Sequence, residues 1–401
     1  MFWKLKKAWY RFFQFLLTRC EYLMVWRQPE LLKGAGMVRQ LPAFVLSKGI
    51  QKVLIITDGV LSKLGLLNGM LEVCKKIGLD YVIFDGVEPN PSIDNIEQAR
   101  KLYVGSGCQG IIAFGGGSSM DCAKAAGARV VKPNQSIGQM GGVFRVLKKL
   151  PPLFAVPTTA GTGSETTLAA VVTDRSTHHK YAIQDLCLIP RYAVLDPELT
   201  VGLPPHITST TGADALCHAV EAYTNRFAPQ YTDRLAEKAV RLIFDNLETA
   251  YHDGTNLEAR EHMLVASYYA GAAFTRACVG NVHAIAHTLG GLYGTPHGLA
   301  NAVILPYVLE DYGSAVYQKL ARLAEIIDLP GNDDEEKAKA FIREIRRMNQ
   351  DMNIVDKLNC IQQHDIPQMI QWAMQEANPL YPVPVIWGPQ EFARIIERIR
   401  V

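Results

Sequence analysis

Residues 110–131, "GIIAFGGGSSMDCAKAAGARVV", begin with a compact apolar strand and continue through a glycine turn into a helix. The same succession recurs along the first half of the chain. Further strands are expected at 52–57 ("KVLIIT"), 81–85 ("YVIFD") and 153–156, and helices at 61–78 and 92–105. Strands that alternate with helices predict an α/β domain on a mostly parallel sheet, covered by helices on both faces.

The turn after residues 110–114 has the composition of a phosphate-binding loop. Gly115–Gly117 allow the backbone to turn sharply and to approach a ligand closely, and Ser118 stands where the helix N-cap is expected. Free amides at a helix N-terminus favour an anion. A second turn, "PTTAGTGSE" at 157–165, adds hydroxyls at Thr158, Thr159, Thr162 and Ser164. Two such loops on one sheet edge indicate a ligand with several phosphates or a pyrophosphate, the alternative being two ordinary tight turns.

Asp58 bears on which nucleotide binds. It follows the strand at 52–57, where a carboxylate can accept hydrogen bonds from ribose hydroxyls. The same charge would repel a 2′-phosphate, so NAD is favoured over NADP. The alternative is that Asp58 only forms the turn in "DG".

The second half of the chain is expected to be helical. After "GLPPH" at 202–206 the β-branched runs stop. Helices are expected at 207–225, 230–250, 256–278, 281–293, 299–312, 315–328 and 333–349. A chain of 401 residues is too long for one ordinary core. We therefore expect an N-terminal extension at 1–26, a dinucleotide-binding domain at 27–205 and a helical metal-binding and substrate domain at 206–401.

Two segments of the helical half combine histidines with a carboxylate. In "GADALCHAVEAY" (212–223), Asp214 and His218 are four residues apart, so they share a helix face in apolar surroundings. In "GNVHAIAHTLGGLYGTPHGLAN" (280–301), His283 and His287 repeat that spacing, and His297 follows in a "PHG" turn. A buried carboxylate needs a partner. One Asp and two or three His make a plausible site for a divalent transition metal. The alternative is buried histidines satisfied by backbone carbonyls.

Residues 1–26, "MFWKLKKAWYRFFQFLLTRCEYLMVW", predict a basic amphipathic helix. Every charge up to Arg19 is positive. One face would carry Phe2, Leu5, Trp9, Phe12, Phe13 and Leu16, and another Lys4, Lys7, Arg11, Gln14 and Thr18. Such a helix can lie on a membrane surface through residues 2–18, or pack on its own domain or on a second subunit. Its uncharged run is too short to span a bilayer.

The overall composition excludes other classes of protein. The formal net charge is only +2, so nothing global indicates nucleic acid. The eight cysteines are scattered singly without a CxxC, which argues against a disulfide framework or a thiolate metal cluster. Reduced thiols fit a cytoplasmic protein.

Four segments together resemble the signature segments of the iron-containing (group III) alcohol dehydrogenase family. They are "GGGSSMD", "PTTAGTGSE", "GADALCHAVEAY" and "VHAIAHTLGGLYGTPHGLANAVILP", in the right order. The resemblance covers residues 30–395, and residues 1–26 depart from the family pattern. It implies the dehydroquinate synthase-like fold, with an α/β nucleotide-binding domain, an all-α C-terminal domain and a site in the cleft between them.

The resemblance also implies site residues and partners. The metal ligands would be Asp214, His218, His283 and His297, with His287 nearby as a proton-relay or substrate-contacting residue. Cofactor contacts would come from Asp58, Asn90, Gly116, Gly117, Ser118, Asp121, Thr158, Thr159, Thr167 and Lys180. The cofactors would be NAD and a divalent metal, Fe(II) or Zn(II), and the assembly a homodimer or larger.

The implied activity is an alcohol dehydrogenase or aldehyde reductase for short primary alcohols or diols. The metal would bind the alcohol oxygen and lower its pKa, and the alkoxide would pass a hydride to NAD. Three alternatives remain at this point. A dehydroquinate synthase-type lyase would need a Lys and Arg cluster, of which 266–301 supplies only Arg276. A metal-dependent hydrolase would not need Asp58 or the glycine loop, and a non-catalytic membrane scaffold would not need the ligands.

Overall fold

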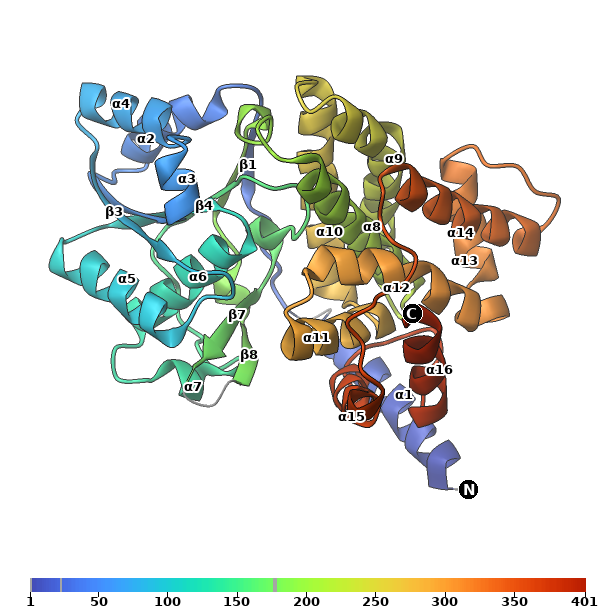
Figure 1. Ribbon diagram of the computed structural model, residues 1–401. Coiled ribbons are helices and arrows are strands. Elements are labelled where there is room, and N and C mark those ends of the chain that lie inside the picture. The colour runs from blue at the N-terminus through green and yellow to red at the C-terminus, as the bar shows by residue number, and fades with distance from the viewer. Residues whose placement is uncertain (1, 22–23, 176–178) are drawn as a thin grey trace. The chain divides into compact units, whose positions relative to one another are not determined.

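The computed structural model describes residues 2–21, 24–175 and 179–401 (Figure 1). The chain divides into two compact units. The α/β unit comprises Trp26–Gly202 and Thr255–Leu264. The helical unit comprises Leu203–Gly254, Val265–Val401 and the described residues before Trp26.

The α/β unit is built on a six-stranded sheet in which every pair is parallel. The strand order is β1-β9-β6-β4-β2-β3. Their bounds are β1 (Glu30–Lys33), β2 (Lys52–Asp58), β3 (Asp80–Val87), β4 (Gly110–Gly115), β6 (Leu153–Pro157) and β9 (Tyr192–Leu195). The parallel sheet confirms the prediction, as do four of its strands, β2, β3, β4 and β6. The four-residue strands β1 and β9 were not predicted.

Alternate residues of the central strands supply two separate cores, one on each face of the sheet. Leu54 and Ile111 pack with residues of α5 (Ile93–Gly105) and α6 (Gly117–Val131). Ile55 and Ile112 pack in the other core, with residues of α2 and α4. Helices on that side are α2 (Met37–Ser47), α3 (Gly59–Lys63) and α4 (Asn68–Ile77), drawn apart from α5 and α6 in Figure 1. The single helix expected at 61–78 is thus two helices, separated at Gly65, whose φ is +72°.

A smaller sheet completes the α/β unit and was not predicted. Its order is β5-β8-β7, and β7 and β8 run antiparallel. The bounds are β5 (Gly142–Val143), β7 (Ala169–Asp174) and β8 (His179–Gln184), with α7 (Ile137–Met140) and the 3₁₀ helix η1 (Ser164–Thr166) beside them in the sequence.

The helical unit contains all the helices expected after residue 206. They are α8 (Pro205–Thr224), α9 (Gln230–His252), α10 (Leu257–Ala277, whose first residues lie in the α/β unit), α11 (Asn281–Tyr293), α12 (His297–Tyr312), α13 (Tyr317–Ile326) and α14 (Asp334–Asp351). Three more helices are α1 (Phe2–Glu21), which was predicted, and α15 (Ile366–Ala377) and α16 (Pro389–Ile399), which were not. In the described part of the chain, no helix combines the length and apolar character needed to cross a membrane.

Candidate active site

Helices α8, α11 and α12 bring together four side chains that can bind a metal. Asp214 and His218 project from successive turns of α8, His283 lies on α11, and His297 is the first residue of α12. One donor atom from each lies within 4.8 Å of all the others. The expected "PHG" turn is instead a helix start, because Pro296 occupies the N-cap and α12 begins directly after it.

A close backbone contact fixes the distance between α8 and α12. A Cβ atom on Gly298 would lie 2.2 Å from the carbonyl oxygen of Thr210, so only glycine fits there. The resulting approach leaves Asp214 Oδ1 3.6 Å from His297 Nε2 and 4.0 Å from His283 Nε2. Burial accompanies this convergence, since Asp214, His218 and His283 are buried and His297 is partly exposed.

The amide of Asn301 marks the point on which the donor atoms converge. Its Nδ2 lies 2.6 Å from Asp214 Oδ1 and 3.1 Å from Nε2 of both His283 and His297. An NH₂ group has two hydrogens, and here it faces three acceptors. Such an excess of lone pairs around one point suits a cation, so the donor set fits a divalent metal. Sequence reasoning missed Asn301, which is fully buried one turn after His297.

Glu221 supports His283 from behind. Its Oε2 lies 2.5 Å from His283 Nδ1, and its Oε1 accepts a hydrogen bond from the Val282 amide at 2.8 Å. Gly280 leaves room for it, because a Cβ there would meet Glu221 Oε1 at 2.7 Å. This contact holds the ring so that Nε2 faces Asp214. Glu221 was not predicted, although it lies seven residues after Asp214 on the same face of α8.

Burial favours the uncharged imidazoles that metal binding requires. Burial, reinforced by the neighbouring histidines, lowers the pKa of His283 well below its usual value. Burial also lowers the pKa of His297 to about 4. It raises the pKa of Glu221 to about 8. His218 is held by its neighbours, with its ring stacked 4.2 Å from Phe274 and 4.6 Å from His283.

His287 lies beside this group without belonging to it. Its ring stacks on His297 at 5.1 Å, and its Nδ1 lies 2.5 Å from Glu376 Oε1. The same carboxylate oxygen accepts a hydrogen bond from the Tyr381 hydroxyl at 2.9 Å. Burial acts to lower the pKa of His287, but Glu376 outweighs it and raises that pKa above its usual value. A half-exposed imidazole held in this way can carry a proton between the site and solvent.

In the α/β unit, four of the expected cofactor contacts lie along one sheet edge. Asp58 ends β2, Asn90 follows β3, Gly116 follows β4 and Thr158 follows β6. These four strands are neighbours in the order β6-β4-β2-β3 and all run parallel. Their carboxyl ends therefore lie in a row, which is where parallel sheets bind ligands.

The loop after β4 differs from the prediction in one respect. The N-cap of α6 is Gly116 and not Ser118, because the helix already begins at Gly117. Glycine is accepted at this position and leaves the first amides of the helix open for an anion. Ser118 is the second helical residue, and its Oγ accepts a hydrogen bond from the Asn90 amide at 3.2 Å.

Asp58 forms the turn that was given above as the alternative to ribose binding. Its Oδ1 accepts hydrogen bonds from the amides of Val60 at 2.9 Å and Leu61 at 3.0 Å, capping α3. Both bonds use the same oxygen, so the cap does not engage Oδ2. Capping and a contact to ribose are therefore compatible.

A buried lysine underlies the second loop and was missed in the sequence. Lys124 is fully buried on α6 and donates to Ser164 Oγ at 3.0 Å, Thr167 Oγ1 at 2.8 Å and the Ala169 carbonyl at 2.9 Å. Asp121 accepts from Ser164 Oγ at 3.2 Å and from the Val171 amide at 3.1 Å. These bonds tie the loop at 158–169 to α6.

Burial perturbs the ionisable groups of this cluster. It lowers the pKa of Lys124 to about 8, and raises that of Asp121 to about 6 and that of Glu165 to about 7. Asp121 and Thr167, both expected to contact the cofactor, thus make bonds within the protein. Lys180 lies on β8 of the smaller sheet, opposite Thr173, and burial lowers its pKa.

The comparisons with known proteins agree with this geometry. Residues 29–197 match the family described as iron-containing alcohol dehydrogenase, and residues 208–395 match the C-terminal region of the Fe-containing alcohol dehydrogenase family. The 1,3-propanediol dehydrogenase of Klebsiella pneumoniae is 36% identical over 395 residues, which cover 97% of this chain and 99% of that protein.

Solved structures give the same result. A crystal structure of 1,3-propanediol oxidoreductase has a TM-score of 0.89 at 36% identity, over 94% of this chain and 100% of the other. A sulfoacetaldehyde reductase from Bifidobacterium kashiwanohense, in complex with NAD+, has a TM-score of 0.84 at 27% identity, over 94% and 99% of the two chains. These matches confirm the predicted dehydroquinate synthase-like fold. The chain therefore belongs to the iron-containing alcohol dehydrogenase family and is an oxidoreductase that depends on NAD and a divalent metal and interconverts alcohols and aldehydes.

Proposed function

We propose that Asp214, His218, His283 and His297 hold the divalent metal, and that a short primary alcohol or diol reacts beside it. The observation that carries this proposal is the convergence of their four donor atoms within 4.8 Å. A divalent metal bound there supplies Lewis-acid catalysis by polarising the oxygen of the alcohol or aldehyde. The protein's part is to keep the imidazoles neutral and fixed, which burial and the contact with Glu221 achieve.

His287 is the proposed proton carrier. Glu376 occupies its Nδ1 side, so Nε2 is the atom that would exchange a proton with the substrate hydroxyl. The Glu376 carboxylate stabilises the protonated ring, and the half-exposed side chain can pass the proton on to solvent. In aldehyde reduction the same atom would return a proton to the developing hydroxyl.

The carboxyl edge of the large sheet is proposed to hold NAD, which would supply the hydride-accepting chemistry. The amides at the start of α6, including those of Gly117 and Ser118, would bind the pyrophosphate with Gly116. Asp58 would accept hydrogen bonds from the ribose through Oδ2. The remaining proposed contacts are Asn90, Asp121, Thr158, Thr159, Thr167 and Lys180. Among these, Asp121 and Thr167 would act mainly by holding their loops in place.

We further propose a cytoplasmic homodimer or larger assembly, with the N-terminal helix as a peripheral contact to a membrane or to another subunit. Fe(II) is the proposed metal, and Zn(II) would suit the same ligands.

NADH formation at 340 nm tests the catalytic proposal. Chelator-treated protein would be compared with protein given Fe(II) or Zn(II) under anaerobic conditions, using a panel of short alcohols and diols. We expect turnover that requires added metal. Protein that binds NAD and metal but oxidises no alcohol would contradict the proposal and favour a lyase.

His287→Ala should lower kcat about 100-fold while the metal content stays unchanged. An unchanged kcat would remove His287 from the proton path.

A further inference from the structure

Helix α1 packs against the helical unit through its polar face. Gln14 is only 1% exposed, and its Nε2 donates to the carbonyls of Pro379 and Tyr381 at 3.0 and 2.7 Å. Arg11 donates to the carbonyls of Val383 and Pro384 at 2.6 and 2.8 Å. All four carbonyls lie in the segment between α15 and α16. Two hydrogen bonds from the Arg11 guanidinium and two from the Gln14 amide, all to main-chain carbonyls, therefore fix the orientation of α1.

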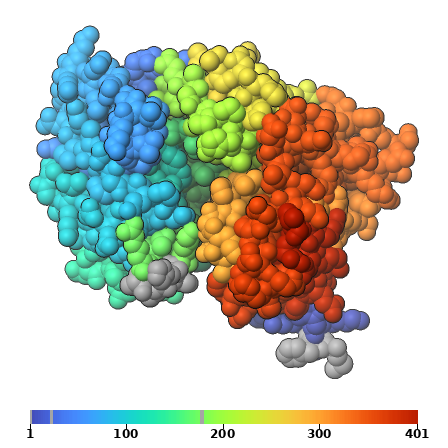
Figure 2. All heavy atoms as spheres, in the orientation of Figure 1, coloured from blue at the N-terminus to red at the C-terminus, as the bar shows by residue number. Residues whose placement is uncertain are grey.

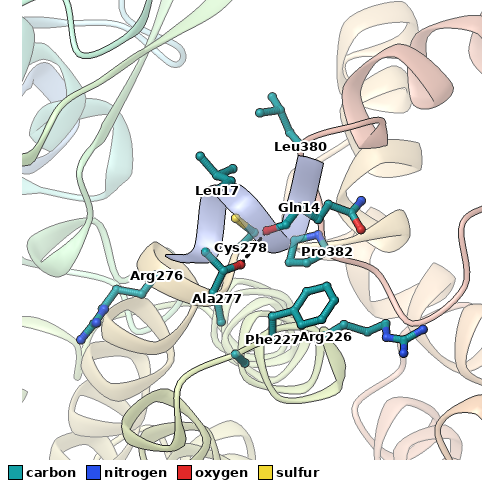
Figure 3. A pocket seen from close by; sticks show the side chains of 11 residues that line it. Gln14, Leu17, Arg226, Phe227, Arg276, Ala277, Cys278, Leu380 and Pro382 are labelled. Atoms are coloured by element: carbon teal, nitrogen blue, oxygen red, sulfur yellow. Dashed lines mark hydrogen bonds between the residues drawn. The ribbon is translucent and has the colours of Figure 1, made fainter. Parts of the chain in front are cut away.

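Figure 3 shows the contact at the C-terminal half of α1. Gln14 and Leu17 lie beside Leu380 and Pro382 and line a small pocket together with Phe227 from the α8–α9 connection. The ring of Phe15 meets that of Phe227 edge to face at 5.9 Å. One side of α1 thus packs on its own unit. This is one of the two kinds of packing that the sequence predicted, the other being packing on a second subunit.

The opposite side of α1 is apolar and exposed. Leu5, Trp9, Phe12 and Leu16 are 63, 58, 56 and 51% exposed. Their spacing of four, three and four residues places them in one stripe, turned away from Gln14. Figure 2 shows α1 as a blue band along the edge of the red C-terminal helices. Polar residues face the protein and large apolar residues face outward, which is the reverse of an ordinary surface helix.

Basic side chains border this apolar stripe. Lys4, Lys6 and Arg19 are exposed, and together with Lys7 and Arg11 they are the charged residues before Cys20, with no acidic residue among them. Aromatic and aliphatic side chains framed by cations suit the interface of an anionic bilayer. A second copy of the chain would suit it less well, because a symmetric contact would set the two sets of cations against each other.

We infer that α1 docks this enzyme on the surface of a bilayer that contains anionic lipid. The stripe of Leu5, Trp9, Phe12 and Leu16 enters the headgroup region, and the flanking lysines and Arg19 contact lipid phosphates. The polar face stays bonded to the 379–384 segment, so the enzyme is held without unfolding any part of it. This inference selects one of the two peripheral contacts proposed above and does not depend on the catalytic assignment.

Co-sedimentation of the full chain with lipid vesicles tests the inference. Vesicles of phosphatidylcholine alone would be compared with vesicles that also contain phosphatidylglycerol, at low and high salt. We expect binding to the anionic vesicles only. Exchanging Trp9 and Phe12 for serine should weaken that binding by about tenfold or more, because the exposed apolar area is lost. Lys4→Ala should weaken it about fivefold, and high salt should reduce it for every form.

Matched controls separate docking from loss of structure. Val104→Ser with Val355→Ser removes two apolar side chains of similar exposure, 57 and 51%, outside α1, and should bind vesicles as the unaltered chain does. NADH formation should be the same in all of these variants, so a failure of docking is distinct from a failure of the catalytic proposal. No binding of the unaltered chain, or equal binding of the Trp9 and Phe12 variant, would overturn the inference. So would light scattering showing that this variant dissociates an oligomer, because the stripe would then be a subunit interface.

Discussion

The donor atoms of the proposed metal site are side-chain atoms that converge on one point, whereas the proposed cofactor site consists mostly of backbone amides. Asp214, His218, His283 and His297 come from three helices, and each contributes one atom to a group 4.8 Å across. Around the sheet edge, Asp58 caps α3, and Thr167 and Asp121 are bonded within the protein. The ligand there would meet chiefly the open amides of α6. Replacing one side chain should therefore cost far more in the first region than in the second.

The largest effect is expected for His218→Ala. Removal of this proposed ligand should weaken metal binding by more than about 100-fold, because the loss of a residue that only supports a ligand costs about 10- to 100-fold. Turnover should fall to background while NAD still binds. Metal content by atomic emission and NAD affinity by calorimetry would check this, with His364→Ala, an 80% exposed histidine, as the control. Retained metal and activity would show that the site does not need this imidazole.

Glu221→Gln tests whether the support behind His283 matters. The amide keeps the size of the side chain, but its NH₂ group replaces one of the two oxygens that contact His283 Nδ1 and the Val282 amide. We expect metal affinity to fall about 10- to 100-fold, with activity restored by excess metal. A chelator competition assay measures this directly. If affinity is unchanged, Asp214 and the imidazoles suffice without help from Glu221.

Lys124→Met probes the cofactor region from within. The variant removes three hydrogen bonds and leaves the buried carboxylate of Asp121 without its neighbouring cation. The unfolding free energy should drop by about 2–3 kcal/mol, and the KM for NAD should rise several-fold as the loop loosens. Metal content should be unaffected. Denaturant unfolding and NAD titration would be compared with Lys101→Met, an exposed lysine on α5. A normal KM would confine Lys124 to stability.

The smallest effect is expected for Asp58→Asn. Asparagine preserves the helix cap and removes only the charge. Discrimination against NADP, measured as the ratio of kcat/KM values for NAD and NADP, should relax by about tenfold. Overall stability should be unchanged. A constant ratio would show that Asp58 only caps α3. The proposed cofactor site would then depend even less on side chains than the proposed metal site does.

The sequence was informative where a residue's role follows from local spacing. The separation of Asp214 from His218 placed both on one helix face, and the alternation of strands and helices predicted the parallel sheet. It was uninformative where the role depends on distant neighbours. Glu221, Asn301 and Lys124 gain their functions from contacts with residues 18 to 87 positions away in the sequence. Strands β1 and β9 are four residues long, too short for periodicity to show.

The contact between Gly298 and the Thr210 carbonyl has a consequence for choosing and engineering the metal. Because the two backbones already touch, α8 and α12 cannot move closer around a smaller ion. A smaller ion would therefore have to be accommodated by movement of the side chains that are proposed to bind it. Grafting the four proposed ligands onto other helices would reproduce the donor atoms without this spacing between α8 and α12. Gly298 would have to be transferred with them, because it sets the distance between the two helix backbones.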